Sequence, residues 1–148
     1  MAVKRLTKRE QSAWRGLLDT HATIRLEMEA RLEPTGISTN DYGVLVLLEE
    51  AGTCGERMSA VARRVGLTAS GFTRLADRLE RRGLIERRRC EEDGRGSIVL
   101  ITDQGAEELM AARATHLDDV RELFTSKLSG HDLDRLAEIW AKLGTCSD

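Results

Sequence analysis

The chain has 148 residues, of which 41% are apolar and 32% are charged, and its net charge is −2. These proportions are typical of a folded, helix-rich protein and exclude an intrinsically disordered one. No apolar run reaches the roughly 20 residues that a membrane-spanning helix needs, and the opening MAVKRLTKRE holds no apolar signal sequence. We therefore expect a cytoplasmic protein without a membrane partner.

The charge is distributed unevenly along the chain. Residues 57–95 hold 11 arginines against six carboxylates, a local charge of +5, whereas residues 1–56 carry −2 and residues 103–148 carry −5. A basic middle between acidic flanks indicates one face that binds an anion. A solvated, ion-paired helix face has the same composition, so the charge alone leaves both interpretations open.

Two helices are expected before residue 52. Thr7 and Glu10 form a capping box ahead of a long amphipathic helix that ends before Pro34. Its apolar face repeats at helical spacing through Trp14, Leu17, Leu18, His21, Ile24, Met28 and Leu32. A second capping box, Ser38 with Asp41, begins a helix that stops at Gly52, and a loop is expected after it.

The next segment has the pattern of a helix-turn-helix. A short helix is expected over residues 59–65, then a turn at Gly66, then a second helix to about residue 82. Ala62 is small where two helices cross closely, and the turn calls for a positive φ that glycine adopts at little cost. An ordinary helical hairpin is the alternative.

A β-hairpin follows and makes the segment a winged helix. Residues 84–90 and 97–102 have strand-like composition, and a polar, glycine-containing turn joins them. Arg95 stands near the tip, where it is expected to enter a minor groove with Asp93 as its support. The alternative for Arg95 is a turn residue that pairs with Asp93.

Two more helices complete the prediction. Thr102 caps a helix from residue 103 to about 127, and Ser129 with Asp132 caps the last one. The expected fold class is mainly α, with the order α-α-α-α-β-β-α-α. Residues 37–102 form the winged helix-turn-helix, and residues 1–36 with 103–148 form a helical dimerisation region, all within one folded unit.

The run DRLERRGL at residues 77–84 and the residues after it resemble the MarR family of bacterial transcription regulators. The remaining matching positions are Asp93, Arg95, Ile101, Thr102 and Gly105. The isoleucine replaces the family's leucine, a conservative departure, and the resemblance covers nearly the whole chain. It implies a homodimer that binds a palindromic site in double-stranded DNA. We expect a repressor that a small, often aromatic, ligand releases.

Specific residues follow for the DNA interface. The four small residues at 68–71 leave the first turn of the second helix bare, as a helix that enters the major groove requires. The expected DNA-binding residues are Thr68, Ser70, Thr73, Arg74, Arg78, Arg88 and Arg95. For Arg78 the expected contact is a phosphate or a neighbouring acid, and Asp77 is expected to orient an arginine.

The first and last helices carry more apolar surface than a small winged helix needs. The expected dimer-interface residues are Leu17, Leu123, Phe124, Leu136, Ile139 and Trp140. The resemblance implies a ligand cleft with the candidates Trp14, His21, Arg25, Met28 and Tyr42. For Trp14 and Met28 a core position is the alternative, and for His21 a polar position at the edge of the stripe.

Other classes of function have less support. The sequence holds no phosphate-binding glycine loop, no HExxH and no GxSxG, so no enzyme and no cofactor are expected. Cys54, Cys90 and Cys146 form no CxxC, and the histidines lack metal-ligand spacing, so no metal is expected. A cysteine-based redox sensor and a winged helix that binds another protein remain the alternatives.

Overall fold

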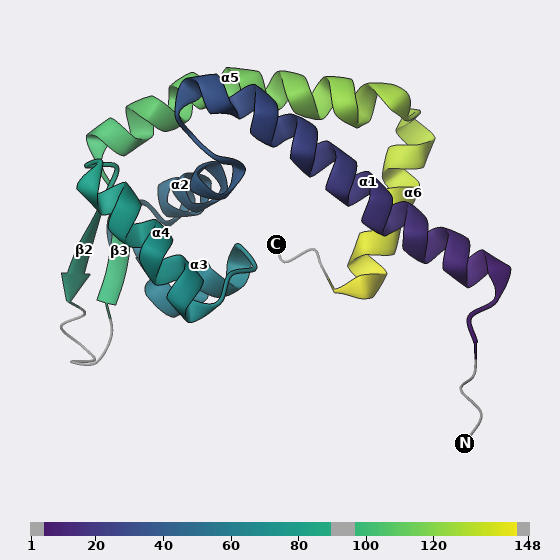
Figure 1. Cartoon of the computed structure of the whole chain (residues 1–148), viewed down its shortest axis with the longest axis horizontal. Coiled ribbons are helices and arrows are strands. Elements are labelled where there is room, and N and C mark those ends of the chain that lie inside the picture. Colours follow the sequence, from purple (N-terminus) through teal and green to yellow (C-terminus); the bar gives the residue numbers. More distant parts are fainter. Residues whose placement is uncertain (1–4, 90–96, 145–148) are drawn as a thin grey trace. The chain divides into compact units, whose positions relative to one another are not determined.

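The computed structural model describes residues 5–89 and 97–144 (Figure 1). The helices are α1 (Lys8–Leu32), α2 (Thr39–Ala51), α3 (Met58–Arg64), α4 (Ala69–Arg81), α5 (Asp103–Leu123) and α6 (Gly130–Leu143). The strands are β1 (Glu56–Arg57), β2 (Ile85–Arg89) and β3 (Ser97–Ile101). Short 3₁₀ turns occupy Glu33–Thr35, Gly52–Cys54 and Thr125–Lys127. The mainly helical, winged helix-turn-helix fold is thus confirmed.

The chain divides into two compact units. Residues 29–115 form the winged unit, which contains α2, α3, α4 and the sheet. Residues 1–28 and 116–148 form the terminal-helix unit, which contains most of α1, the end of α5 and all of α6. The two units are described separately below.

The expected helix caps are present. The backbone N–H of Asp41 donates to Ser38 Oγ at 3.1 Å, and that of Asp132 donates to Ser129 Oγ at 3.2 Å. At α1, the backbone N–H of Thr7 donates to the Glu10 carboxylate at 2.6 Å. Hydrogen bonds from Thr7 lower the pKa of Glu10, and those from Ser129 lower the pKa of Asp132. Each cap satisfies N–H groups that the first helical turn leaves free.

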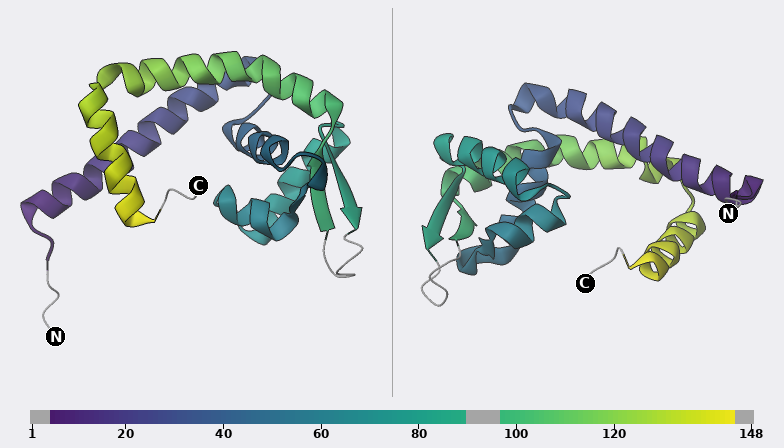
Figure 2. Two further views of the ribbon diagram at one scale, coloured as in Figure 1. Left: turned by 180° about the vertical axis from the view of Figure 1, so that it is seen from behind. Right: turned by 60° about the horizontal axis from the view of Figure 1, so that its bottom comes forward.

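The winged unit has an apolar core between its helices and a three-stranded antiparallel sheet of order β1-β3-β2. In the sheet, Ile85 lies opposite Ile101 and Arg87 lies opposite Val99. Figure 2 shows the strands from behind and from below. The largest side chains of this core are Phe72, Leu32, Ile37, Leu45, Leu48, Leu79, Leu84, Ile85, Leu109, Val44, Val61 and Val99.

Two details differ from the sequence-based expectation. The segment after α2 is not only a loop, because Glu56 and Arg57 pair with Val99 and Ile98 of β3 as the strand β1. A strand of two residues has no periodicity of its own and exists only through its partner. Helix α5 also ends at Leu123 rather than near residue 127, and a 3₁₀ turn follows at Thr125–Lys127.

The terminal-helix unit lacks such a core. None of its described apolar side chains is buried within the single chain. Trp14 is 55% exposed, Leu18 47% and Ile139 44%. Its buried residue is polar, Asp119 on α5. No helix among the described residues is both long and apolar enough to cross a membrane.

Candidate nucleic-acid interface

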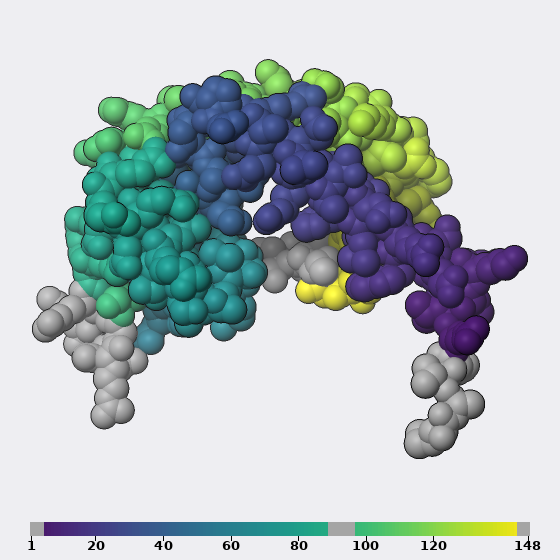
Figure 3. Space-filling model, in the orientation of Figure 1, coloured from purple at the N-terminus to yellow at the C-terminus, as the bar shows by residue number. Residues whose placement is uncertain are grey.

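Helix α4 has two sharply different faces. Thr68 caps it, and its Oγ1 accepts the backbone N–H of Gly71 at 3.1 Å. One face is buried in the winged core and consists of Phe72, Leu75, Ala76 and Leu79. The opposite, solvent-exposed face carries Ser70, Thr73, Arg74 and Arg81, with Asp77 half-buried among them. In the space-filling view this helix lies at the teal surface of the molecule (Figure 3).

The polar groups at the start of α4 differ in what they offer a ligand. Thr73 donates its hydroxyl proton to the carbonyl of Ala69 at 2.9 Å, so its oxygen retains only acceptor capacity. Ser70 Oγ lies 3.3 Å from Thr68 Oγ1, and either hydroxyl can donate. Arg74 forms no ion pair with any residue that the structure describes, so its guanidinium is available as a donor.

Several other arginines of the basic segment are already paired with carboxylates. The pairs are Arg64 with Glu50, Arg78 with Asp41, Arg82 with Glu108, Arg87 with Asp77 and Glu80, and Arg88 with Glu86. Where both partners are exposed, as in the pairs of Arg64 and Arg88, the ion pair contributes about 0–1 kcal/mol, so a phosphate can compete for the arginine. Much of the local positive charge is therefore balanced within the fold.

Arg78 and Arg88 differ in how freely they can leave their partners. The partner of Arg78 is the buried carboxylate of Asp41, whose side chain is 3% exposed and which also caps α2. Moving Arg78 to a phosphate would leave that carboxylate buried and uncompensated, which is costly. The partner of Arg88 is the exposed Glu86, so Arg88 is the freer of the two. This geometry favours a positioning role for Arg78.

The C-terminal end of α4 is tied to the start of α5. Thr102 Oγ1 donates to the Gly83 carbonyl at 2.6 Å, and Gln104 Nε2 donates to the Arg82 carbonyl at 3.2 Å. Gly105 lies so close to this segment that a Cβ there would be 2.0 Å from the Leu84 carbonyl oxygen. The threonine and glycine of the sequence motif therefore have a common role, which is to join the C-terminal end of α4 to α5.

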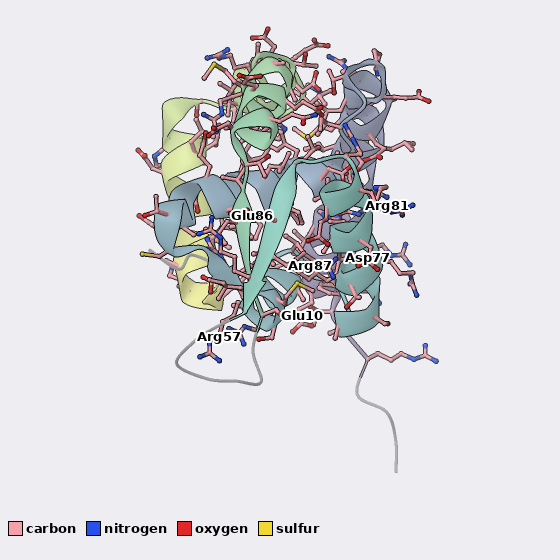
Figure 4. All side chains as sticks on the ribbon, turned by 90° about the vertical axis from the view of Figure 1, so that its left-hand side faces the viewer. Glu10, Arg57, Asp77, Arg81, Glu86 and Arg87 are labelled. Atoms are coloured by element: carbon pink, nitrogen blue, oxygen red, sulfur yellow. The ribbon has the colours of Figure 1, made fainter. Side chains whose placement is uncertain are left out.

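The wing contacts α4 through Arg87 of β2. Its guanidinium pairs with Asp77 (Figure 4). Its Nε lies 3.4 Å from a carboxylate oxygen of Glu80. The expected wing residues Asp93 and Arg95 lie outside the described residues, as does Cys90.

Comparison with known proteins decides the family. The family model described as "MarR family" matches residues 35–96. The HTH-type transcriptional repressor MdtR of Bacillus subtilis is 30% identical over 128 residues, which are 84% of this chain and 79% of MdtR. AbsC, a MarR family transcriptional regulator from Streptomyces coelicolor, is 31% identical with a TM-score of 0.88 over 96% of both chains. The chain belongs to the MarR family.

A second MarR regulator links the fold to DNA. Sco3205 from S. coelicolor was solved in complex with DNA and is 28% identical, with a TM-score of 0.88 over 97% of this chain and 90% of its own. The chain spans 65% of the length of YdgJ, an uncharacterised HTH-type transcriptional regulator of B. subtilis. These relatives are transcription regulators, which agrees with the sequence resemblance.

Two exposed arginines of the helix-turn-helix were not among the DNA-binding residues expected from the sequence. Arg81 is exposed two turns after Arg74 on the same face of α4, and Arg63 is exposed on α3. The spacing of seven residues between Arg74 and Arg81 was a usable signal for the first. No comparable periodicity singles out Arg63 on its short helix.

The residues expected at a ligand cleft have different surroundings. In the terminal-helix unit, Trp14, His21 and Arg25 are exposed and Met28 is half-buried. In the winged unit, Tyr42 is 8% exposed. Hydrogen bonds with Glu49, and then with Tyr42, raise the pKa of Arg113.

The residues expected at a dimer interface are incompletely covered in the single chain. Leu17 is 39% and Ile139 44% exposed. The others are half-buried, namely Leu123, Phe124, Leu136 and Trp140.

Within the described part of the chain, no group of three or more metal-ligating side chains comes together. Cys54 is a free, exposed thiol, and Cys146 lies outside the described residues.

Proposed function

We propose that the chain is a homodimeric MarR repressor that binds an inverted repeat in double-stranded DNA and leaves it on binding a small ligand. The observation that carries the proposal is the exposed face of α4, which lies opposite a closed apolar core. It presents small polar groups and Arg74, whose guanidinium forms no ion pair with any described residue. A helix with such a first turn can enter the major groove, where its N-terminal residues meet base edges. The relative Sco3205, solved with DNA, supports this assignment.

Three residues of α4 have distinct roles in the proposal. Arg74 offers only donors, which suits the two acceptors of guanine in the major groove. Thr73 offers an acceptor and a methyl group, which suit the amino group of adenine or cytosine and the methyl group of thymine. Ser70 can donate or accept, so it discriminates least between bases. Thr68 is the helix cap, and a phosphate is the natural partner of the N–H groups beside it.

The proposed phosphate contacts come from the remaining cations. Arg88 can exchange its exposed partner Glu86 for a phosphate, and Arg81 lies on the DNA-facing side of α4. Arg95, with Asp93 beside it, is assigned to the minor groove from the sequence pattern of the wing.

Dimerisation is assigned to the terminal-helix unit, because apolar side chains on α1 and α6 are left without a core in one chain. Several large apolar side chains left exposed on the same unit are typical of a protein interface. A two-fold dimer presents two α4 helices to successive turns of DNA, about 34 Å apart. The operator is then an inverted repeat.

The effector is assigned as a small molecule, and aromatic compounds are the class to test first. CouR from Rhodococcus jostii RHA1, a structural neighbour of the same fold at 23% identity and a TM-score of 0.77, was solved bound to p-coumaroyl-CoA. Trp14, His21, Arg25, Met28 and Tyr42 are the candidate contacts. Each can be replaced singly once a ligand has been found by its effect on DNA binding.

The proposal is tested by selecting genomic fragments with the purified protein and then measuring affinity against salt for the best fragment. An inverted repeat and a log–log slope equivalent to roughly 6–10 released counterions are expected for a dimeric operator complex. Weak binding without sequence preference would contradict the proposal and favour a protein-interaction module. Expression of a reporter behind the selected fragment then separates repression from activation.

A further inference from the structure

We infer that Arg87 is a positioning residue for DNA binding, which pairs with two carboxylates of α4, Asp77 and Glu80, and masks the negative charge that the helix would otherwise present to DNA. The inference rests on the proposed function, since it assumes that the exposed face of α4 meets DNA. Arg87 lies on β2 and not on α4, so its effect on DNA binding is indirect and acts through the two carboxylates.

The location of Arg87 requires it to have partners. In the sheet its Cα is paired with that of Val99, so its side chain leaves the sheet on the same face as Ile85 and Val99, which are core residues. The side chain is only 24% exposed. A guanidinium withdrawn from water to this extent must recover its hydrogen bonds within the protein. One nitrogen does so, because Nη2 donates to the Asp77 carboxylate (Figure 4). The buried Nε has no hydrogen-bond partner among the described residues, and its nearest compensation is the charge of Glu80, whose carboxylate oxygen lies 3.4 Å away.

The location of the two carboxylates explains why masking matters. Asp77 lies seven residues after Ser70 and three after Arg74, so it falls in the middle of the exposed face of α4. Its side chain is 49% exposed, and that of Glu80 is 42% exposed. An unpaired carboxylate at this place would repel the phosphates of a groove into which the helix enters.

Arg87 is the specific source of compensation. Among the described residues, Asp77 and Glu80 each have an ion pair with Arg87 and with no other cation. The neighbouring Arg81 is directed differently, because its Nε donates to the backbone carbonyl of Asp77 at 3.1 Å rather than to the carboxylate. Removal of Arg87 therefore leaves two negative charges uncompensated at once.

The test uses the operator fragment found with the wild-type protein and compares dissociation constants by fluorescence anisotropy. Arg87→Gln should weaken binding at least tenfold at low salt. The loss should shrink at high salt, because added ions screen the exposed carboxylates. Asp77→Asn should recover much of the affinity when combined with Arg87→Gln, although alone it should change affinity less than threefold. The matched control is Arg113→Gln, which removes the same charge from an ion pair with Glu49 in the same unit and should leave affinity within twofold.

A third variant separates masking from folding. Asp77→Asn, Glu80→Gln and Arg87→Gln together remove the charges of all three side chains while keeping the shapes of the two on α4, so this protein should bind DNA close to the wild-type level. Unchanged affinity in Arg87→Gln, or a loss that neither the double nor the triple variant recovers, would overturn the inference. If the wild-type protein itself selects no fragment, the proposed function fails instead, and the two failures are thus distinguishable.

Discussion

The two units of this chain differ in how far they bury their apolar side chains within the single chain. In the winged unit, a continuous core of side chains such as Phe72, Leu79 and Val99 is sealed from water within one chain. In the terminal-helix unit, side chains of similar size on α1 and α6 remain exposed, and the buried residue is Asp119. Hydrophobic burial is the main favourable contribution to folding, so a unit without it needs another surface. The comparison teaches that the first unit has a core of its own, whereas the described apolar side chains of the second have none in a single chain, which is why we propose that a partner covers them.

The largest expected effect is the loss of that assembly in Ile139→Asp. Ile139 is 44% exposed in the single chain, so an isolated monomer would tolerate a carboxylate there. A partner that covers Ile139 would not, because burial of an isoleucine contributes about 1.5–3 kcal/mol and an unpaired buried charge costs more. We expect the dissociation constant of the dimer to rise at least a hundredfold, as measured by sedimentation across a range of protein concentrations.

The control for this prediction is Ala141→Asp, which adds the same charge at another exposed position of α6. It should leave the dimer intact. An Ile139→Asp protein that sediments like the wild type at every concentration would place the interface elsewhere. It would also mean that the exposed apolar surface of this unit has another partner.

The next effect contrasts two glycines, one in each unit. A Cβ on Gly105 would lie 2.0 Å from the Leu84 carbonyl oxygen, whereas a Cβ on Gly16 of α1 would meet nothing within 4 Å. Overpacking costs about 1–3 kcal/mol, and alanine returns about 1 kcal/mol of helix propensity. Gly105→Ala should therefore lower the free energy of unfolding by up to about 2 kcal/mol, and Gly16→Ala should raise it by up to about 1 kcal/mol.

Chemical denaturation of both variants checks this prediction. Gly16 lies on the polar side of α1, away from the stripe of Trp14, Leu17 and Leu18, so its expected gain does not depend on the dimer. Equal effects of the two substitutions would contradict the close contact at Gly105. A destabilising Gly16→Ala would indicate that a partner also covers the polar side of α1.

The winged unit was the more predictable from sequence, because its signals are local. Its expected caps at Ser38 and Thr102 are each formed by residues three apart, and the turn at Gly66 has the positive φ that was expected. The buried face of α4 also follows directly from helical periodicity. By contrast, β1 depends on a strand some forty residues later and had no local signal.

The candidate interface was predictable only in its residue types. Periodicity places Ser70, Thr73 and Arg74 on one face, but it cannot show that Arg78 is held by the buried Asp41. The ion pairs of Arg87 with α4 are likewise long-range contacts. Sequence reasoning identified Asp77 as a residue that orients an arginine, and the fold supplies that arginine from β2.

Substitution of Thr73 in the winged unit should have a smaller effect, which is a change in the preference for one base. Thr73→Val keeps the shape of the side chain but removes the acceptor that remains after the hydroxyl has donated to Ala69. Discrimination at one position of each half-site should fall by about 1–3 kcal/mol if the acceptor reads a base. Thr73→Ser, which keeps the oxygen and loses the methyl group, is the matched variant.

Competition between operator variants that differ at single positions measures this preference. An equal loss of affinity for all sequences would instead make Thr73 a phosphate contact. The oligomeric state should be unchanged in both variants, since Thr73 lies outside the terminal-helix unit.

The smallest effect concerns pH and the terminal-helix unit. Burial lowers the pKa of His116, and the charge of Asp119 opposes this shift only partly. Between the lowered pKa and the usual value of about 6.5, the unfolded chain binds more protons than the folded one, so stability rises with pH across this window. The stability should accordingly fall as the pH is lowered through about 6.5 and stop falling below the pKa of the folded state. His116→Gln should flatten this part of the profile of unfolding free energy against pH, whereas His131→Gln, at an exposed imidazole on α6, should not. If the slope of unfolding free energy against pH persists in His116→Gln, another group takes up the proton. His116 would then give no coupling between pH and the stability of this unit.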